Sequence, residues 1–233
     1  MDFGFGLGSS VRSPITRSGM VAWLKGDRYD AATGTWEDAS GRGNQVTQGT
    51  VGARPAATTI ASVAALSFDG GDSLDLAHYT GGALANSSIF VACEWPASAA
   101  SYHVLVDGHS GGRNVLFQET NNRLTCDAGA AMFPGVGSAT AAGARCVCVG
   151  QFAGASTYLA VHANGAAVVS ADPVAANPGT QAMDGLVVGQ AFNSGGSYVG
   201  KIGEVIIYDR ILSATERSSV VSYLCAKFSV VTL

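Results

Sequence analysis

The chain has 233 residues, of which 47% are apolar, 31 are glycine and only 13% are charged. This balance predicts one large all-β domain with many short strands, and it argues against a helical protein or a charged, disordered one. The 13 basic and 17 acidic residues are scattered and no apolar run could span a membrane, so we expect neither a nucleic-acid partner nor a membrane partner.

Residues 1–18 are predicted to form an N-terminal arm, and residues 19–233 a single domain. Glycine alternates with apolar residues in the arm, and glycine stabilises neither a helix nor a strand. The segment is either a flexible leader or an assembly arm that docks its apolar side chains into a neighbouring subunit; these side chains are Phe3, Phe5 and Leu7. No signal peptide is recognisable, so we expect synthesis in the cytoplasm of a host cell.

The next part of the chain consists of short apolar runs bounded by turn residues, which is typical of β-strands. We predict strands at 88–95, 102–107, 114–119, 123–126, 145–152 and 157–162. Asn164-Gly165 is the strongest hairpin signal, because both residues tolerate the positive φ of a type I′ turn.

The last predicted elements are a strand that ends at Asp209-Arg210 and a helix at 213–227. Ser213 and Glu216 have the spacing of a capping box, in which each side chain accepts a backbone N–H of the other residue. Apolar residues at helical spacing follow, and they predict an amphipathic helix. These residues are Val220, Val221, Leu224 and Phe228.

This closing phrase, YDR-x-LS-x-x-E at 208–216, resembles the end of laminin-G-like domains in the concanavalin A-like lectin/glucanase superfamily. Five further segments resemble motifs of that family in the same order, and together they cover residues 19 to 228. They are VAWL at 21–24, DASGRGN at 38–44, LSFDGGDSL at 66–74, HANGAAV at 162–168 and LVVGQ at 186–190. The resemblance implies a two-sheet antiparallel jelly-roll sandwich with one short C-terminal helix.

The resemblance does not bring a catalytic site with it. Glycanases of this fold are similar in an E-x-D-x-x-E strand motif, which this chain lacks, and neither Glu94 nor Glu119 has a carboxylate two residues away. No nucleophile elbow or zinc-binding histidine pair is recognisable either. His103 and His162 are predicted to be half-buried, and His109, on a turn beside Asp107, to be the most exposed histidine. We therefore expect no catalytic residue and no enzyme.

Calcium is the cofactor that the resemblance brings into question. Asp38, Asn44, Asp69 and Asp72 are suitable oxygen ligands, but no dense acidic cluster is present. The alternative is that Asp38 and Asn44 form local turns, with side-chain hydrogen bonds to the backbone. We expect no metal and no cofactor, with these residues as weak candidates.

Cysteines and aromatic residues are expected to be mainly structural. The five cysteines have no disulfide or zinc spacing, so we predict buried, reduced thiols. Trp23 and Trp36 are predicted to lie in the core, and Trp95 at the rim of the sandwich. A sugar site needs exposed aromatic side chains with polar partners, and the sequence does not identify the residues of such a site.

The predicted function is that of a non-enzymatic virion structural protein: a bacteriophage capsid decoration, head-fibre or tail-associated subunit with its lectin-like domain facing outward. The Gly-aromatic arm, the missing signal peptide and the low share of charge favour this hypothesis, with other virion proteins and further copies of the chain as partners. The alternative is a carbohydrate-binding adhesion module that recognises host surface glycans.

Overall fold

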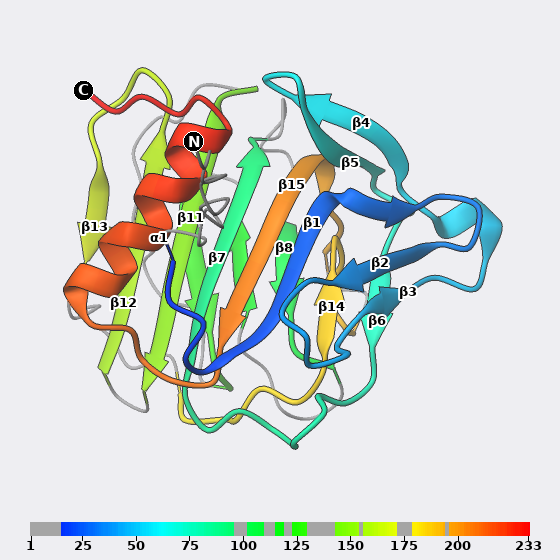
Figure 1. The fold of residues 1–233 in the computed structure, drawn as a ribbon, viewed down its shortest axis with the longest axis horizontal. Helices are drawn as coiled ribbons and strands as arrows, with labels where there is room; N and C mark the ends of the chain where they lie inside the picture. The colour runs from blue at the N-terminus through cyan, green and yellow to red at the C-terminus, as the bar shows by residue number, and fades with distance from the viewer. Residues whose placement is uncertain are drawn as a thin grey trace, which may run out of the picture.

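A computed structural model describes residues 15–95, 102–109, 115–118, 123–129, 143–153, 156–171, 179–193 and 196–233. It is an antiparallel β-sandwich with one C-terminal helix (Figure 1), which confirms the predicted fold class. Phe3, Phe5 and Leu7 lie outside the described residues, so their assembly role stays a prediction.

The front sheet of Figure 1 contains, in spatial order, β13, β12, β11, β7, β15 and β1, and every neighbouring pair is antiparallel. A hairpin of β4 and β5 is attached to the start of β15 through β5. The strands are Met20–Asp30 (β1), Ala56–Ile60 (β4), Val63–Asp69 (β5), Ser87–Glu94 (β7), Arg145–Ala153 (β11), Ser156–Ala163 (β12), Val169–Ala171 (β13) and Val199–Tyr208 (β15).

The back sheet contains, in spatial order, β10, β9, β8, β14, β6 and β3. Strand β2 pairs with both β3 and β1 and so connects the two sheets. The strands are Thr35–Asp38 (β2), Val46–Thr47 (β3), Leu74–Leu76 (β6), His103–Asp107 (β8), Val115–Gln118 (β9), Leu124–Asp127 (β10) and Leu186–Val188 (β14), and one 3-10 turn spans Val51–Ala53. The strands predicted from the sequence are confirmed, with ends that differ by one or two residues.

Both faces of the front sheet are buried. In β7, Ile89 and Val91 point into the core between the sheets, whereas Phe90 and Ala92 point to the outer face, beneath α1. A strand that is buried on both faces has no polar side to alternate with its apolar one. This explains why the strands of the front sheet are continuous apolar runs in the sequence.

Helix α1, Ala214–Lys227, covers the outer face of the front sheet (Figure 1). Its capping box is present as predicted: the backbone N–H of Glu216 donates to the Ser213 side chain, and the N–H of Ser213 donates to the Glu216 carboxylate. Val220 and Leu224 are buried against the sheet. Among the described residues, no helix is long and apolar enough to cross a membrane.

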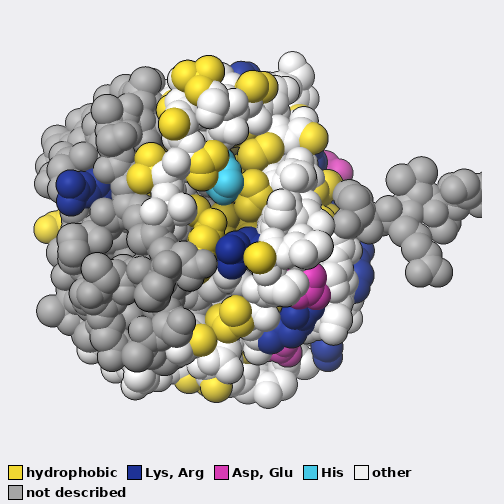
Figure 2. Space-filling view, turned by 90° about the vertical axis from the view of Figure 1, so that its left-hand side faces the viewer, with side chains coloured by type: hydrophobic (Ala, Val, Ile, Leu, Met, Phe, Trp, Pro, Cys, Tyr) yellow, Lys and Arg dark blue, Asp and Glu magenta, His cyan; other side chains and the backbone are white. Residues whose placement is uncertain are grey.

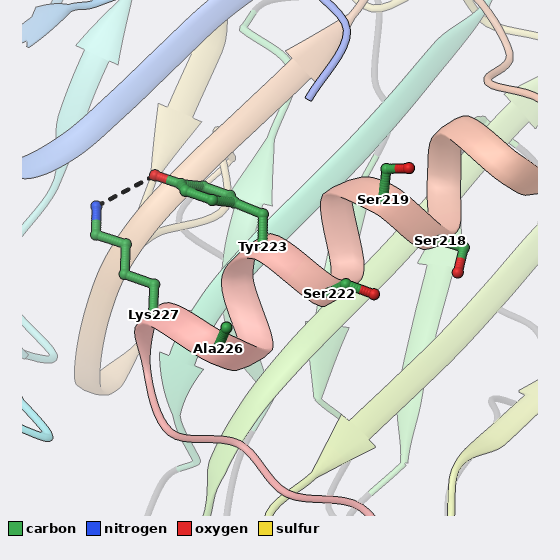
Figure 3. Close-up of a pocket in the computed structure, with 6 residues that line it drawn as sticks. All are labelled: Ser218, Ser219, Ser222, Tyr223, Ala226 and Lys227. Carbon is green, nitrogen blue, oxygen red and sulfur yellow. Dashed lines mark hydrogen bonds between the residues drawn. The ribbon is translucent and has the colours of Figure 1, made fainter. Parts of the chain in front are cut away.

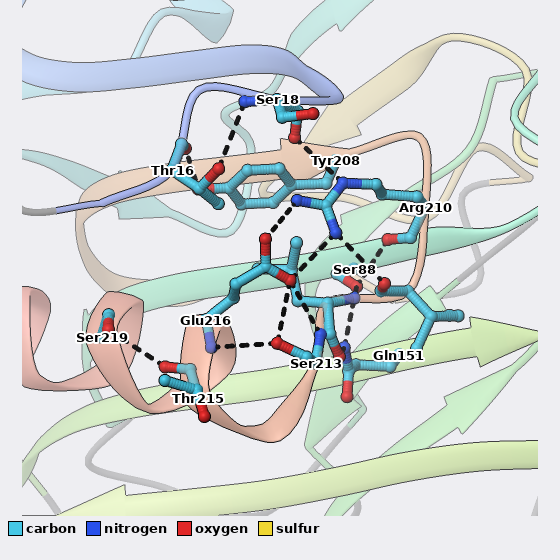
Figure 4. A network of polar contacts seen from close by, with 12 residues as sticks. Thr16, Ser18, Ser88, Gln151, Tyr208, Arg210, Ser213, Thr215, Glu216 and Ser219 are labelled. Atoms are coloured by element: carbon cyan, nitrogen blue, oxygen red, sulfur yellow. Dashed lines mark hydrogen bonds and ion pairs between the residues drawn. The ribbon is translucent and has the colours of Figure 1, made fainter.

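A polar network joins the start of α1 to the sheet (Figure 4). The Arg210 guanidinium donates two hydrogen bonds to Glu216, at 2.6 and 3.0 Å, and a third to the backbone oxygen of Ser18. Arg210 first, and then the backbone of Ser213, lower the pKa of Glu216 to about 2. Because the carboxylate stays ionised down to low pH, the cap keeps its acceptor over the whole neutral range.

The hairpin predicted at Asn164-Gly165 is present, but the predicted turn type is wrong. Strands β12 and β13 pair on either side of it, and only Gly165 has a positive φ, of 75°. Asn164 instead binds the C-terminal segment: its side-chain oxygen accepts a hydrogen bond from the backbone N–H of Val231 at 3.0 Å. The neighbouring Gly165 N–H donates to the carbonyl of Val231, so the C-terminal segment holds this turn in place.

Candidate functional site

A row of four residues crosses the outer face of the back sheet. Thr47 lies opposite Asp75, Asp75 opposite Val187, and Val187 opposite Asp107, on β3, β6, β14 and β8. Residues that face each other across antiparallel strands point to the same side of a sheet. The neighbours of Asp75 in β6, Leu74 and Leu76, pack into the core, so the row faces away from it.

A polar hollow of about 410 Å³ opens over this row. Its floor contains Asp75 and Val187, and its walls come from the loops that follow β3, β8 and β14. The lining residues are Thr47, Gln48, Gly49, Ser73, Asp75, His109, Val187, Gln190, Ala191 and Phe192. Hydroxyl, amide and carboxylate groups thus surround one hollow, together with an aromatic ring.

One part of the hollow combines a carboxylate, an imidazole and an aromatic ring, which belong to Asp75, His109 and Phe192. The Asp75 carboxylate lies 3.3 Å from Nε2 of His109, and the His109 ring lies against that of Phe192, with 4.6 Å between centroids. The Phe192 side chain is 41% exposed. Burial raises the pKa of Asp75, and the nearby charge of His109 opposes this effect. A carboxyl group with a raised pKa in a cleft is a common feature of functional sites.

Asp107 has a structural task in the same row. It is fully buried, and one of its carboxylate oxygens accepts a hydrogen bond from the backbone N–H of Phe192 at 2.9 Å. This bond fixes the loop after β14 above the sheet. The buried Asp107 side chain therefore holds the backbone of Phe192 in place beside the hollow.

A second aspartate–histidine pair lies next to the hollow. Nδ1 of His78 is 2.9 Å from Asp184, and the rings of His78 and His109 meet edge to face with 6.4 Å between centroids. The His78 side chain is 69% exposed and that of His109 only 21%, so the prediction that His109 is the most exposed histidine is wrong. His109 is shielded because it turns back over β6 towards Asp75.

The candidate calcium ligands hold their own loops. The Asp38 carboxylate accepts from the backbone of Trp23, Ser40 and Asn44 and from the Ser40 hydroxyl, at 2.6 to 3.0 Å. The Asn44 amide donates to the carbonyl of Val21. These hydrogen bonds are the local side-chain contacts that the sequence predicts as the alternative to calcium binding.

Asp69 and Asp72 bind their own turn in the same way, with backbone N–H groups of Gly71 and Asp69 as donors. In the described part of the chain, no group of three histidine, cysteine or acidic side chains is close enough to hold a metal ion. The expectation of no metal, with Asp38, Asn44 and Asp69 as weak candidates, stays a prediction.

Trp95 was predicted to lie at the rim, and the structure contradicts this. Its side chain is 1% exposed within the core between the sheets, since β7 and its backbone bonds to Ala144 and Gly143 carry it inward. Trp23 and Trp36 are buried as predicted. The exposed aromatic side chain of the hollow is instead Phe192.

A wide groove of about 680 Å³ runs along the exposed side of α1 (Figure 3), but it consists only of residues of that helix. At its end, the ammonium group of Lys227 bonds to Glu204, a fully buried residue of β15, and lies 3.4 Å from the Tyr223 hydroxyl. Glu204 also accepts from the Trp23 indole and from Tyr223. These contacts anchor the helix to the sheet and offer no enclosed site.

A smaller hollow of about 160 Å³ lies between β12 and α1, on the side shown in Figure 2, where most of the described surface is uncharged. Burial lowers the pKa of His162 there. The guanidinium group of Arg217 lies 3.7 Å from the centre of the Tyr158 ring and closes this space. The hollow is too small for a drug-sized ligand.

Sequence reasoning missed Asp75 and Phe192. The Leu-Asp-Leu alternation of 74–76 is a signal for an outward aspartate, but three residues are too few to establish a strand. Phe192 lies in a loop, where no period predicts exposure. Only the pairing of β3, β6, β14 and β8 brings these residues together.

Several solved structures with a similar fold are sialidases or arabinofuranosidases. Trypanosoma rangeli sialidase is similar over 91% of this chain and 33% of its own, with 16% identity and a TM-score of 0.64. A GH54 α-L-arabinofuranosidase is similar over 94% of this chain and 61% of its own, with 14% identity and a TM-score of 0.63. The chain therefore spans about a third of the sialidase. No family model and no curated protein matches it.

At such low identity the likeness shows the fold alone, but it corrects two predictions. The solved structures that share the sandwich are carbohydrate-active enzymes, and none of those reported is a virion protein; the virion structural role is therefore wrong. The same structures contradict the expectation of a non-enzyme, because those reported are enzymes, a sialidase and arabinofuranosidases.

Proposed function

We propose that this chain is a carbohydrate-binding domain and that the hollow over the back sheet holds a sugar. The observation that carries the proposal is the exposed Phe192 ring beside the half-exposed Asp75 carboxylate, across one polar hollow. A sugar ring packs its C–H face on an aromatic side chain and donates its hydroxyl groups to fixed acceptors. The hollow offers both kinds of contact.

The rigidity of the site supports this proposal. Thr47 and Asp75 lie on paired strands, and Gln48 is fixed by hydrogen bonds from its amide to Ser73, at 3.1 and 3.2 Å. Groups that are ordered before binding lose less conformational entropy when a ligand arrives. The resemblance to laminin-G-like domains and the fold shared with glycosidases favour the same class of ligand.

A second candidate is glycoside hydrolysis with Asp75 as the general acid, which its raised pKa favours. Hydrolysis usually requires two carboxyl groups that face the sugar. Asp107, two strands away on the same face, is buried and bonded to Phe192, so the described hollow presents one carboxyl group. Binding is the function that this geometry supports best.

The test is binding of the purified chain to an array of immobilised neutral and acidic oligosaccharides, followed by titration of the best ligand. We expect Phe192→Ala to weaken binding between about twofold and tenfold, the range of one aromatic contact. Tyr102→Ala is the matched control, because Tyr102 is 40% exposed but does not line the hollow, and it should leave affinity unchanged.

If no oligosaccharide binds, or if both variants bind as the wild type does, the proposal is wrong. Release of nitrophenol from 4-nitrophenyl α-L-arabinofuranoside, abolished by Asp75→Asn, would instead favour the hydrolytic candidate.

A further inference from the structure

The hollow over the back sheet carries a negative charge that is only partly balanced. Among its described lining residues, Asp75 is the one carboxylate and none is a lysine or an arginine. Oδ1 of Asp75 is buried and has no hydrogen-bond partner in the described structure, and the ion-pair partner of the carboxylate is His109. A histidine balances this charge only while it is protonated.

Among the described residues, one arginine, Arg54, lies beside the hollow and binds backbone carbonyl groups. Arg54 contacts the lining residues Gln48 and Gly49, but it does so by donating to their backbone carbonyls, at 2.8 and 3.2 Å. A third nitrogen of Arg54 donates to the carbonyl of Ala32 at 2.6 Å. Each nitrogen of the guanidinium group thus bonds to a backbone carbonyl and fixes the loop after β3, and Arg54 is not among the described lining residues of the hollow.

We propose that the hollow selects neutral sugars over sugars that carry a carboxylate, and that Asp75 makes this distinction. The inference rests on the proposed function and deepens it. A ligand carboxylate placed against Asp75 meets a like charge, and no lysine or arginine among the described lining residues is there to compensate it. A neutral sugar meets the same carboxylate as a hydrogen-bond acceptor for its hydroxyl groups.

Two ligands test this inference: arabinofuranosyl-α-1,2-xylobiose, which is neutral, and sialic acid, which is acidic. Isothermal titration of the wild-type chain should give sialic acid an affinity at least about fivefold lower, the effect of two unit charges 4 Å apart even at the dielectric constant of water. The methyl ester of sialic acid removes the charge and keeps the ring. It should bind more tightly than the acid by the same factor.

Asp75→Asn should remove the difference between sialic acid and its methyl ester. Asp184→Asn is the matched control, because this aspartate also pairs with a histidine but does not line the hollow. It should preserve the difference.

The negative results distinguish failure of the proposed function from failure of the charge selection. If the wild type binds none of the three ligands although the oligosaccharide array is positive, the charge selection is overturned; if the array is negative as well, the proposed function is overturned with it. If the wild type binds sialic acid as tightly as the ester, or if Asp75→Asn retains the difference, only the charge selection is overturned.

Discussion

Asp38 and Asp75 show how the surroundings of an aspartate decide what it can bind. Both oxygens of Asp38 already accept hydrogen bonds from its own loop and from β1, so this residue stabilises the loop. The Asp75 carboxylate has one histidine partner and is 43% exposed in a hollow. The oxygen of Asp75 that pairs with His109 keeps a lone pair for a ligand, whereas the saturated oxygens of Asp38 cannot bind one without loss of their own bonds.

The raised pKa of Asp75 predicts a pH-dependent selection of ligands. Burial favours the neutral carboxyl group, so Asp75 is charged only above a pKa that is higher than that of a free aspartate. Repulsion of sialic acid is therefore present above this pKa and lost as the pH falls through it. Titrations from about pH 7 to about pH 4 should show the affinity for sialic acid rising relative to the neutral sugar.

His109→Gln is the control for the histidine that pairs with Asp75, since it removes this partner and keeps Asp75 itself. A rise in relative affinity that persists in this variant is due to Asp75. A ratio that stays constant with pH in both proteins would contradict the assignment of the charge effect to Asp75.

The start of helix α1 is specified by residues that are neighbours in the sequence. Ser213→Ala removes the acceptor of the Glu216 N–H and should lower the free energy of unfolding by about 1 kcal/mol, the usual effect of losing an N-cap. Urea denaturation of both proteins measures this difference. Ser222→Ala changes the same residue type on the exposed side of the helix, where alanine is at least as favourable as serine. An equal loss in the control would show that the cap is not the cause.

The helix could be predicted and the hollow could not, for one physical reason. The capping box depends on contacts between residues 213 and 216, which the sequence places three positions apart. The hollow depends on the register of β3, β6 and β14, which have two or three residues each. Such short strands carry almost no periodic signal, and their register follows from the packing of the whole sandwich.

The errors about His109 and Trp95 have the same origin. His109 follows Asp107 closely in the sequence, but Asp107 is buried beneath the loop that carries Phe192, and His109 pairs with Asp75 from another strand. Trp95 precedes a proline, which is typical of a strand end, yet this end lies inside the core. A sequence pattern indicates where a strand stops but not which part of the sandwich lies there.

The molecule as a whole has two apolar layers. One fills the space between the sheets, and the other lies between the front sheet and α1, with Trp23, Phe90 and Phe228 among its buried residues. Because of the second layer, this chain buries more apolar side chains than the space between its two sheets would hold. It therefore accounts for part of the high apolar share of the sequence.

All five cysteines are free thiols; Cys93, Cys126, Cys146 and Cys148 are buried in the core between the sheets, and Cys225 is half-buried on α1. Burial raises the pKa of Cys126 to about 12 and that of Cys225 to about 11. The thiolate is the reactive form of cysteine. Native thiols should therefore be slow towards a disulfide reagent, and Cys225 should be the first to react.

Thiol labelling consequently reports opening of the whole sandwich. With 5,5′-dithiobis(2-nitrobenzoic acid) at about pH 8, we expect at most one thiol to react before unfolding, and that reaction to disappear in Cys225→Ser. The four core thiols should react together, at a rate set by the population of the unfolded state. Ser213→Ala should then accelerate them about fivefold, the factor that corresponds to 1 kcal/mol. If two core thiols react early, or if the cap variant leaves their rate unchanged, the sheets separate locally and the two layers do not unfold as one unit.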